Sequence, residues 1–311
     1  MLLTPLRVIG ATAWLMVLGS VALADDPAPG QTEIAMDIAL TSGRAEVHVD
    51  DVPFFGPGQS LSADASIIAS LPANTIFGPG RNAVVIRFWP GASGLGNEPG
   101  LRLRFGYAPT DTYPDAFSER PHAVLVEITR DPAAALGFRL DHSIAGQPLL
   151  TAQVHPDLTQ TVDDGIEARL DLDVQLALPD RKWLAGQTLS DDAATRAALI
   201  DQMRIAHDAI AAGPEAFLHA LGPMIARNAA TVGMTPQQAV QTEYAPFFDP
   251  SLGFVLQPFD AEQAELTLMG NGRLATLTPS PIRFVNEEIN ESGAPTLLYW
   301  LDADGNWQII H

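Results

Sequence analysis

The run "GIEARLDLDVQLALP", Gly165 to Pro179, decides the first part of the fold. From Ile166 to Val174 every second residue is apolar, and the residues between them are charged. A period of two places alternate side chains on opposite faces of an extended chain. The run therefore predicts a β-strand with one face in a core and one face in solvent.

Shorter alternating runs recur from about Thr32 to Pro179, and Gly, Pro, Asn and Asp separate them, as is typical of turns between strands. Many short antiparallel strands with one apolar face favour a β-sandwich. We expect residues 25–180 to form this all-β sandwich domain. The runs are "AEVHVDDV", "NAVVIRFWP", "GLRLRFGY", "HAVLVEIT" and "LGFRLDHS".

Beyond Arg181 the pattern becomes helical. A first helix is expected to be capped by Ser190 or Asp191 and to end at Gly213-Pro214, where a second begins and runs to about Val232. Thr235, Pro236 and Gln238 have the spacing of a capping box for a short third helix.

Strands follow the helices, with a hairpin turn predicted at Gly270-Asn271-Gly272 and another turn at Asn290 to Gly293. Helices followed by an antiparallel meander indicate an α+β domain. We place this domain at residues 181–311.

The last segment, "LLYWLDADGNWQIIH", contains a pattern of Asp302, Asp304 and Asn306 that could begin a calcium loop. Such a loop needs Gly at position 6 and Glu at position 12. Position 6 is Trp307, and position 12 lies beyond His311. The alternative is a hairpin turn built on Asp304-Gly305-Asn306, and we predict the turn and no metal.

Both faces of the strand at Leu297 to Leu301 are apolar, with Tyr299 on one and Trp300 on the other. We therefore expect helices on one face and a second domain or a partner on the other. The aromatic residues form either plain core or a pocket that binds a ligand. The candidate ligand-binding residues are Trp183, Tyr244, Phe248, Arg283, Tyr299 and Trp300.

The N-terminus predicts export. Arg7 precedes an apolar run that ends in Ala22-Leu23-Ala24, which has the pattern of a cleaved secretory signal at residues 1–24. No later segment reads as a membrane span, so no membrane anchor is expected after cleavage. The chain has no cysteine, so its core must hold it without disulfides. We expect a periplasmic or secreted protein of a Gram-negative bacterium.

The net charge of −20 over 311 residues repels phosphate backbones, so nucleic acid is not expected as a partner. No motif predicts a catalytic residue, a metal site or a cofactor. Glu215 and His219 share a helix face, and His207 lies on the preceding helix, but we favour surface residues over a metal site.

The stretch from Ala45 to Pro90 resembles accessory β-sandwiches of galactose-binding type, which occur beside glycosidase domains. Their "L-x-x-G-x-N-x-I-x-V" run is matched by Gly80, Asn82 and Val84, whereas Val49-Asp50-Asp51 replaces their "V-N-G" turn. The chain is also similar to uncharacterised secreted bacterial proteins. The resemblance implies a sandwich fold and carries no activity.

Helices followed by a meander that ends in "D-G-N-W-Q-I-I" look like the NTF2-like cone. That fold holds enzymes, binding proteins and structural domains, so it does not decide function. The Asp/His pair of its hydrolytic and isomerase members has no counterpart after Asp260.

The sequence therefore predicts an exported, non-catalytic binding or interaction protein of the bacterial envelope. Its expected ligand is a protein, a small molecule or a carbohydrate of unknown identity. Two alternatives stay open. One is a small-molecule hydrolase or isomerase with a pocket in the C-terminal domain. The other is an acidic inhibitor or immunity-type protein that meets a basic partner.

Overall fold

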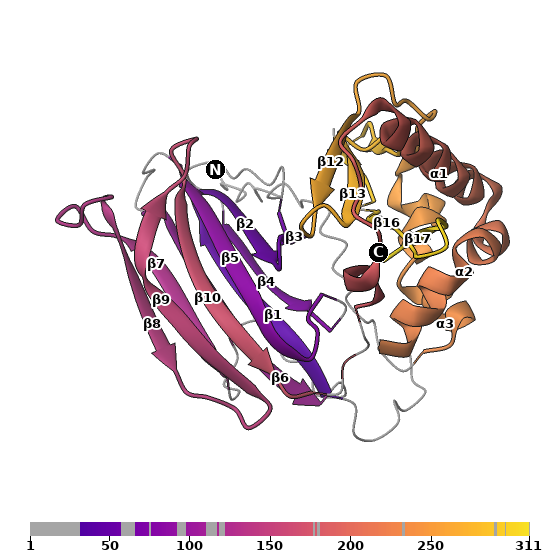
Figure 1. The fold of residues 1–311 in the computed structure, drawn as a ribbon. Helices are drawn as coiled ribbons and strands as arrows, with labels where there is room; N and C mark the ends of the chain where they lie inside the picture. The colour runs from indigo at the N-terminus through magenta and orange to yellow at the C-terminus, as the bar shows by residue number, and fades with distance from the viewer. Residues whose placement is uncertain are drawn as a thin grey trace, which may run out of the picture.

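A computed structural model describes residues 32–56, 66–74, 76–91, 98–109, 117, 122–176, 178, 181–231, 234–288, 291–295 and 297–310. The predicted signal segment, residues 179–180 at the expected domain boundary and Gly233 lie outside the described residues. Antiparallel sheets are the main secondary structure of the described chain, and a helical region follows the first two of them (Figure 1). None of the helices in this part is both long enough and apolar enough to cross a bilayer.

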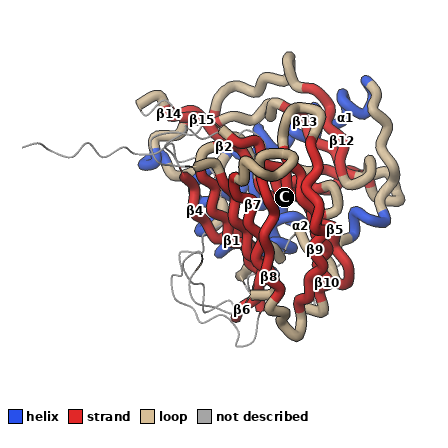
Figure 2. The backbone as a smooth tube through the Cα atoms, turned by 90° about the vertical axis from the view of Figure 1, so that its left-hand side faces the viewer, coloured by secondary structure: helices blue, strands red, loops and turns tan. Residues whose placement is uncertain are grey.

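Two five-stranded antiparallel sheets form the N-terminal part, in the orders β4-β1-β6-β7-β8 and β3-β2-β5-β10-β9. Figure 2 views these strands from the side away from the helices, which lie mostly behind them in that view. The strands are β1 (Thr32–Thr41), β2 (Gly43–Val49), β3 (Val52–Phe55), β4 (Ser66–Pro72), β5 (Gly80–Pro90), β6 (Gly100–Pro109), β7 (Val124–Arg130), β8 (Phe138–Ile144), β9 (Leu150–Gln160) and β10 (Ile166–Val174).

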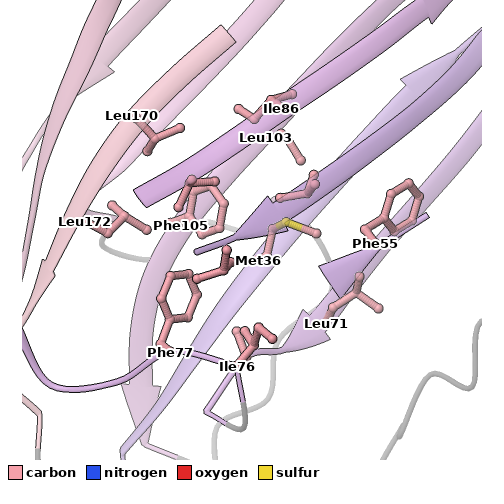
Figure 3. Packing of buried hydrophobic residues seen from close by; sticks show 14 of the residues in the cluster. Met36, Phe55, Leu71, Ile76, Phe77, Ile86, Leu103, Phe105, Leu170 and Leu172 are labelled. Carbon is pink, nitrogen blue, oxygen red and sulfur yellow. The ribbon is translucent and has the colours of Figure 1, made fainter. Parts of the chain in front are cut away.

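The predicted strand at Ile166 to Val174 is confirmed as β10. Its apolar residues are buried, because they point into a core that both five-stranded sheets line. Leu170 and Leu172 of β10 lie close to Ile86 of β5 and to Phe105 of β6, which belongs to the other sheet (Figure 3). This first cluster of buried side chains supplies most of the apolar burial of the N-terminal part.

The helices are α1 (Ala193–Ala212), α2 (Pro214–Thr231) and α3 (Pro236–Thr242). The capping box of α3 is confirmed, since Thr235 and Gln238 exchange side-chain and backbone hydrogen bonds. The predicted cap of α1 is wrong by one or two residues. Asp192 caps this helix by accepting a hydrogen bond from the Thr195 amide, because the chain enters the helix only after the bends at 191–192.

The C-terminal part has two more antiparallel sheets, of orders β12-β13-β16-β17 and β11-β14-β15. The Gly270 to Gly272 hairpin is confirmed between β12 and β13. The turn predicted at Asn290 to Gly293 is wrong for residues 291–293, which pair with β14 as a strand. These strands are β11 (Val255–Leu256), β12 (Glu265–Met269), β13 (Leu274–Thr278), β14 (Phe284–Asn286), β15 (Glu291–Gly293), β16 (Tyr299–Leu301) and β17 (Trp307–Ile309).

The sheet of β12, β13, β16 and β17 lies between the helices and the two five-stranded sheets (Figure 1). One face of this sheet joins the first hydrophobic cluster, through Leu298 and Trp300. The other face joins a second cluster with the helices, through Leu297 and Tyr299. The sequence predicted that the strand at Leu297 to Leu301 is covered on both faces, and this is confirmed for β16 and the two residues before it.

The turn between β2 and β3 adds polar contacts between the five-stranded sheets and the C-terminal part, a boundary that we call the seam. Asp50 and Asp51 both have positive φ, of 50° and 65°, in a tight turn that usually favours Asn and Gly. The Asp50 carboxylate forms an ion pair with Arg181, and Asp51 accepts a hydrogen bond from the Asn271 amide. The two carboxylates therefore link the N-terminal sheets to segments that follow the expected domain boundary.

Candidate functional site

The structure divides the six candidate ligand-binding residues among three places. Trp183, on the 3-10 turn Lys182–Ala185, packs with Trp300 in the first cluster. Tyr244, Phe248 and Tyr299 belong to the second cluster or pack against it. The remaining residue, Arg283, is exposed, and its carbonyl oxygen accepts a hydrogen bond from Gln257. The six residues do not line one pocket.

Aromatic rings fill the space between α2, α3 and β14. The Phe217 ring lies 5.3 Å from Tyr244, 5.9 Å from Phe247 and 5.5 Å from Phe248, between centroids. Phe247 also stacks on Phe284 at 5.3 Å. Rings at these separations pack as core. Tyr244 and Phe248 therefore act in packing.

Glu243 stands out in this region because its environment disfavours a charge. Its Oε1 atom is buried and has no hydrogen-bond partner within the described part of the chain. Burial raises the pKa of the Glu243 carboxyl above its ordinary value. The neighbouring Tyr244 hydroxyl accepts a hydrogen bond from Asn228 at 3.1 Å. Burial also lowers the pKa of Arg227, which donates to the Ile309 carbonyl.

A second polar region covers the outer face of the sheet β3-β2-β5-β10-β9. The residues of β10 that do not enter the core carry charge, and they face charged residues of β5 and β9 across the sheet. Glu167 lies opposite Arg87, and Arg169 lies opposite His155. We call this set the arginine face; its members are Arg81, Arg87, His155, Glu167, Arg169 and Asp171.

Glu167 holds two guanidinium groups of the arginine face. Its Oε2 accepts from Arg87 Nε at 3.0 Å, and its Oε1 accepts from Arg169 Nη2 at 2.6 Å and Nε at 2.8 Å. Partial burial raises the pKa of Glu167, but the hydrogen bonds from the two arginines outweigh burial, so the pKa lies below its usual range. The carboxylate is therefore charged and both arginines are fixed in direction.

Four residues further along β10, Asp171 also holds two basic side chains. Its Oδ2 accepts from Arg81 Nη2 at 2.7 Å and lies 3.1 Å from His155 Nε2. The hydrogen bond from Arg81 is the main cause that lowers the pKa of Asp171, and His155 adds to it. Each carboxylate of the arginine face is thus shared by two basic side chains.

Trp89 lies at one end of the same sheet face, but its ring is partly covered. The Arg44 guanidinium lies 3.8 Å from the ring centroid, and Arg44 pairs with Asp163 at 3.7 Å. A Cβ on Gly165 would come within 2.6 Å of the indole Nε1 atom. Trp89 is half-buried, with Arg44 over one face of its ring and Gly165 close to its indole nitrogen.

One other place with chemical character does not form a site. A hollow of about 400 Å³ beside the start of α1 is lined by polar residues that include Asp191, Asp192, Arg196 and Glu265. The Arg196 guanidinium donates hydrogen bonds to the Ala261 and Ala264 carbonyls. Within the described ranges, no three His, Cys, Asp or Glu side chains gather to hold a metal ion.

The stretch around Asp302 is a hairpin, as predicted. Asp302 Oδ1 accepts hydrogen bonds from the Asp304 and Asn306 amides, at 3.0 and 2.8 Å, and Oδ2 accepts from Gln308. The hydrogen bond from the Asn306 amide is the largest cause that lowers the pKa of Asp302. Both carboxylate oxygens of Asp302 therefore accept hydrogen bonds from within the hairpin.

In comparisons with known proteins, no family model, no curated protein and no solved structure matches the chain. The assignment of function therefore rests on the side chains described above.

The sequence reasoning missed the arginine face, although part of its signal was visible. Alternation in β10 shows that Glu167, Arg169 and Asp171 share the outer face. Their partners could not be found, because strand order and register decide which residues lie opposite them. Arg87 and Glu167 are 80 positions apart along the chain.

Proposed function

We propose that the chain is an exported, non-catalytic binding protein of the bacterial envelope. In this proposal residues 25–180 form a β-sandwich and residues 181–311 form an NTF2-like α+β domain. A shared hydrophobic cluster between the two five-stranded sheets supports the first assignment, and helices packed on one face of an antiparallel sheet support the second. Neither fold decides the function by itself.

The arginine face is the observation that carries the proposal. A broad sheet face on which two carboxylates fix the direction of four basic side chains is already ordered before a partner arrives. Pre-ordered polar groups lose little conformational freedom on binding. Of the six predicted ligand-binding residues, by contrast, the five aromatic ones pack in the two clusters, and Arg283 is exposed.

Cell fractionation tests the proposal. A C-terminally tagged chain with its own first 24 residues is expressed in a Gram-negative host, and its N-terminus is sequenced. We expect a periplasmic or secreted product that begins at Asp25, and we expect it to sediment with washed envelope fragments. Recovery in the cytoplasm with residues 1–24 intact, or no sedimentation with envelope fragments, would overturn the proposal.

Glu243 favours a second candidate function, a small-molecule hydrolase or isomerase. A carboxyl group whose pKa is raised by burial is suited to general acid–base work, and Tyr244 and Arg227 lie in the same region. A panel of ester and ketone substrates tests this function. Turnover that is lost in Glu243→Gln but kept in Glu215→Gln, an exposed position on α2, would favour the enzyme over the binding protein.

A further inference from the structure

The strand β8 lies at an open edge of the sheet β4-β1-β6-β7-β8, on the side of the molecule away from the helices (Figure 1). It pairs with β7 on one side, and no other described strand pairs with it on the other. Phe138 and Leu140 are half-buried there, and Ile144 is 48% exposed. An edge strand of this kind presents unpaired N–H and C=O groups that can bind a further strand.

The backbone groups of every second residue of β8 point away from β7. Two hydrogen bonds flank the strand: the Asp131 amide donates to the Gly137 carbonyl before it, and the Ala145 amide donates to the Ala123 carbonyl after it. Directly opposite residues of an antiparallel pair alternate between bonded and unbonded. Counting inward from these two bonds, the odd-numbered residues of β8 bond to β7. Its even-numbered residues, Leu140 among them, therefore direct their N–H and C=O groups toward the open edge.

Among the edges of the two five-stranded sheets, β8 is the one best suited to pairing. β9 contains Pro156, which has no N–H donor, and a bulge near Glu167 interrupts the pairing of β9 with β10. β3 has four residues. β4 carries no charged side chain, so no charge on it selects one register for a partner strand. β8 has seven residues, neither proline nor glycine among them, and two opposite charges.

The two charged residues of β8 form a pattern that is complementary to itself. Arg139 and Asp141 lie on the outer face, 59% and 48% exposed, and pair with each other at 2.7 Å. Asp141 also lies directly opposite Glu127 of β7, which pairs with Arg102 of β6 at 3.1 Å. Like charges directly opposite each other destabilise a sheet. A base on the open side of Asp141 would offset this repulsion.

We propose that β8 pairs antiparallel with the same strand of a second copy of this chain, with Leu140 opposite Leu140 across a two-fold axis. In this register Arg139 of each copy lies opposite Asp141 of the other, at a position without backbone hydrogen bonds, where cross-strand side chains approach most closely. The outward N–H and C=O groups of Leu140 bond to those of the second copy. A register that pairs all seven residues would instead set Asp141 opposite Asp141. The charges therefore select the shorter register.

The pairing also covers apolar surface. Phe138 and Leu140 pack against the first hydrophobic cluster, and a second strand beside them would bury them further. The contact is small, so we expect a dimer that dissociates on dilution. The net charge of −20 on each copy opposes association, but charges more than about 8 Å apart are largely screened at physiological salt. This pairing concerns assembly and is independent of the proposed function.

Sedimentation velocity of the purified protein at physiological salt tests the pairing. We expect monomer at low concentration and dimer as the concentration rises. Arg139→Glu and Asp141→Arg should each weaken self-association about tenfold, because each variant sets like charges opposite each other twice in the dimer. An equimolar mixture of the two variants should form a heterodimer, because both cross-strand pairs are then attractive again.

Arg102→Glu is the matched control, because it reverses a charge on the same sheet face at an exposed position of β6, away from the open edge. It should associate like the wild type, and circular dichroism and thermal melts check that every variant is folded. A protein that is monomeric at every concentration would overturn the proposal, as would a dimer that both charge variants keep or folded variants that form no heterodimer. Loss of the dimer in Ile68→Asp alone would place the interface at β4 and contradict pairing through β8.

Discussion

Tyr299 and Trp300 are neighbours on β16, yet they belong to different hydrophobic clusters. Tyr299 packs with the helices, and Trp300 packs with the five-stranded sheets. Burial raises the pKa of the Tyr299 hydroxyl, which lies 3.4 Å from the Gln202 carbonyl oxygen. One short strand thus contributes to two cores at once, and the stability of each core depends on it.

Trp300→Ala should destabilise the protein by about 3–5 kcal/mol, as large-to-small changes of buried aromatic residues do. The loss should appear in the sheets and in the helices together, because β16 is common to both cores. Urea unfolding followed by far-UV circular dichroism and by tryptophan fluorescence measures it. Trp307→Ala, at a half-buried position, should cost less. Helices that keep their wild-type midpoint in Trp300→Ala would contradict this coupling.

Asp50→Asn should cost about 1–3 kcal/mol, because it removes a charged hydrogen bond to Arg181. Asn tolerates positive φ well, so the turn itself is not the cause of the loss. Asp164→Asn is the control, since Asp164 also has positive φ but is exposed and accepts a hydrogen bond from Gln160, with no ion pair among the described residues. The urea midpoint reports both variants. Equal midpoint shifts would mean that the ion pair contributes nothing.

Glu243→Gln should stabilise the protein, and the gain should grow with pH. The folded-state pKa of Glu243 is raised, so the folded chain holds this proton more tightly than the unfolded chain. The stability that this proton gives is present below the unfolded pKa and is lost as pH rises through the folded pKa. Glutamine does not titrate. Thermal melts at pH 4 and pH 8 measure the difference, and a gain that is larger at pH 4 would reverse the sign.

A chelator should leave the thermal melt unchanged, because the turn amides and Gln308 use the carboxylate of Asp302. Asp302→Ala should lower the melting temperature, whereas Asp304→Ala, at an exposed position of the same turn, should change it little. The folded-state pKa of Asp302 is lowered, so its stabilising effect is present above the unfolded pKa and is lost as pH falls. A large drop in melting temperature with EDTA would restore the calcium interpretation.

Local patterns were enough to predict much of this fold. The alternation in β10 and at Leu297 to Leu301, and the capping box at Thr235, depend on residues a few positions apart. The seam and the arginine face could not be predicted in the same way. Asp50 meets Arg181 131 positions away, and the strand order that brings Arg87 to Glu167 is set by the packing of two sheets.

The aromatic residues explain why the pocket prediction did not gather into one site. Large aromatic side chains in strands serve cores as often as ligands, and the sequence pattern is the same for both. The sequence predicted that the charged residues of β10 face solvent, but only Arg169 and Asp173 are exposed, because the basic partners of Glu167 and Asp171 cover these two carboxylates. The sequence did not show that Glu167 and Asp171 each bind two basic side chains, because this depends on their cross-strand partners.

Arginine-selective labelling with phenylglyoxal, read by peptide mass spectrometry with and without washed envelope fragments, tests the central claim most directly. The account predicts that Arg81 and Arg169 lose reactivity when envelope material is present, and that Arg139 and Arg130 react as before. Unchanged reactivity at Arg81 and Arg169, or protection of Arg227 in the helical region instead, would contradict the claim that the arginine face is the binding surface.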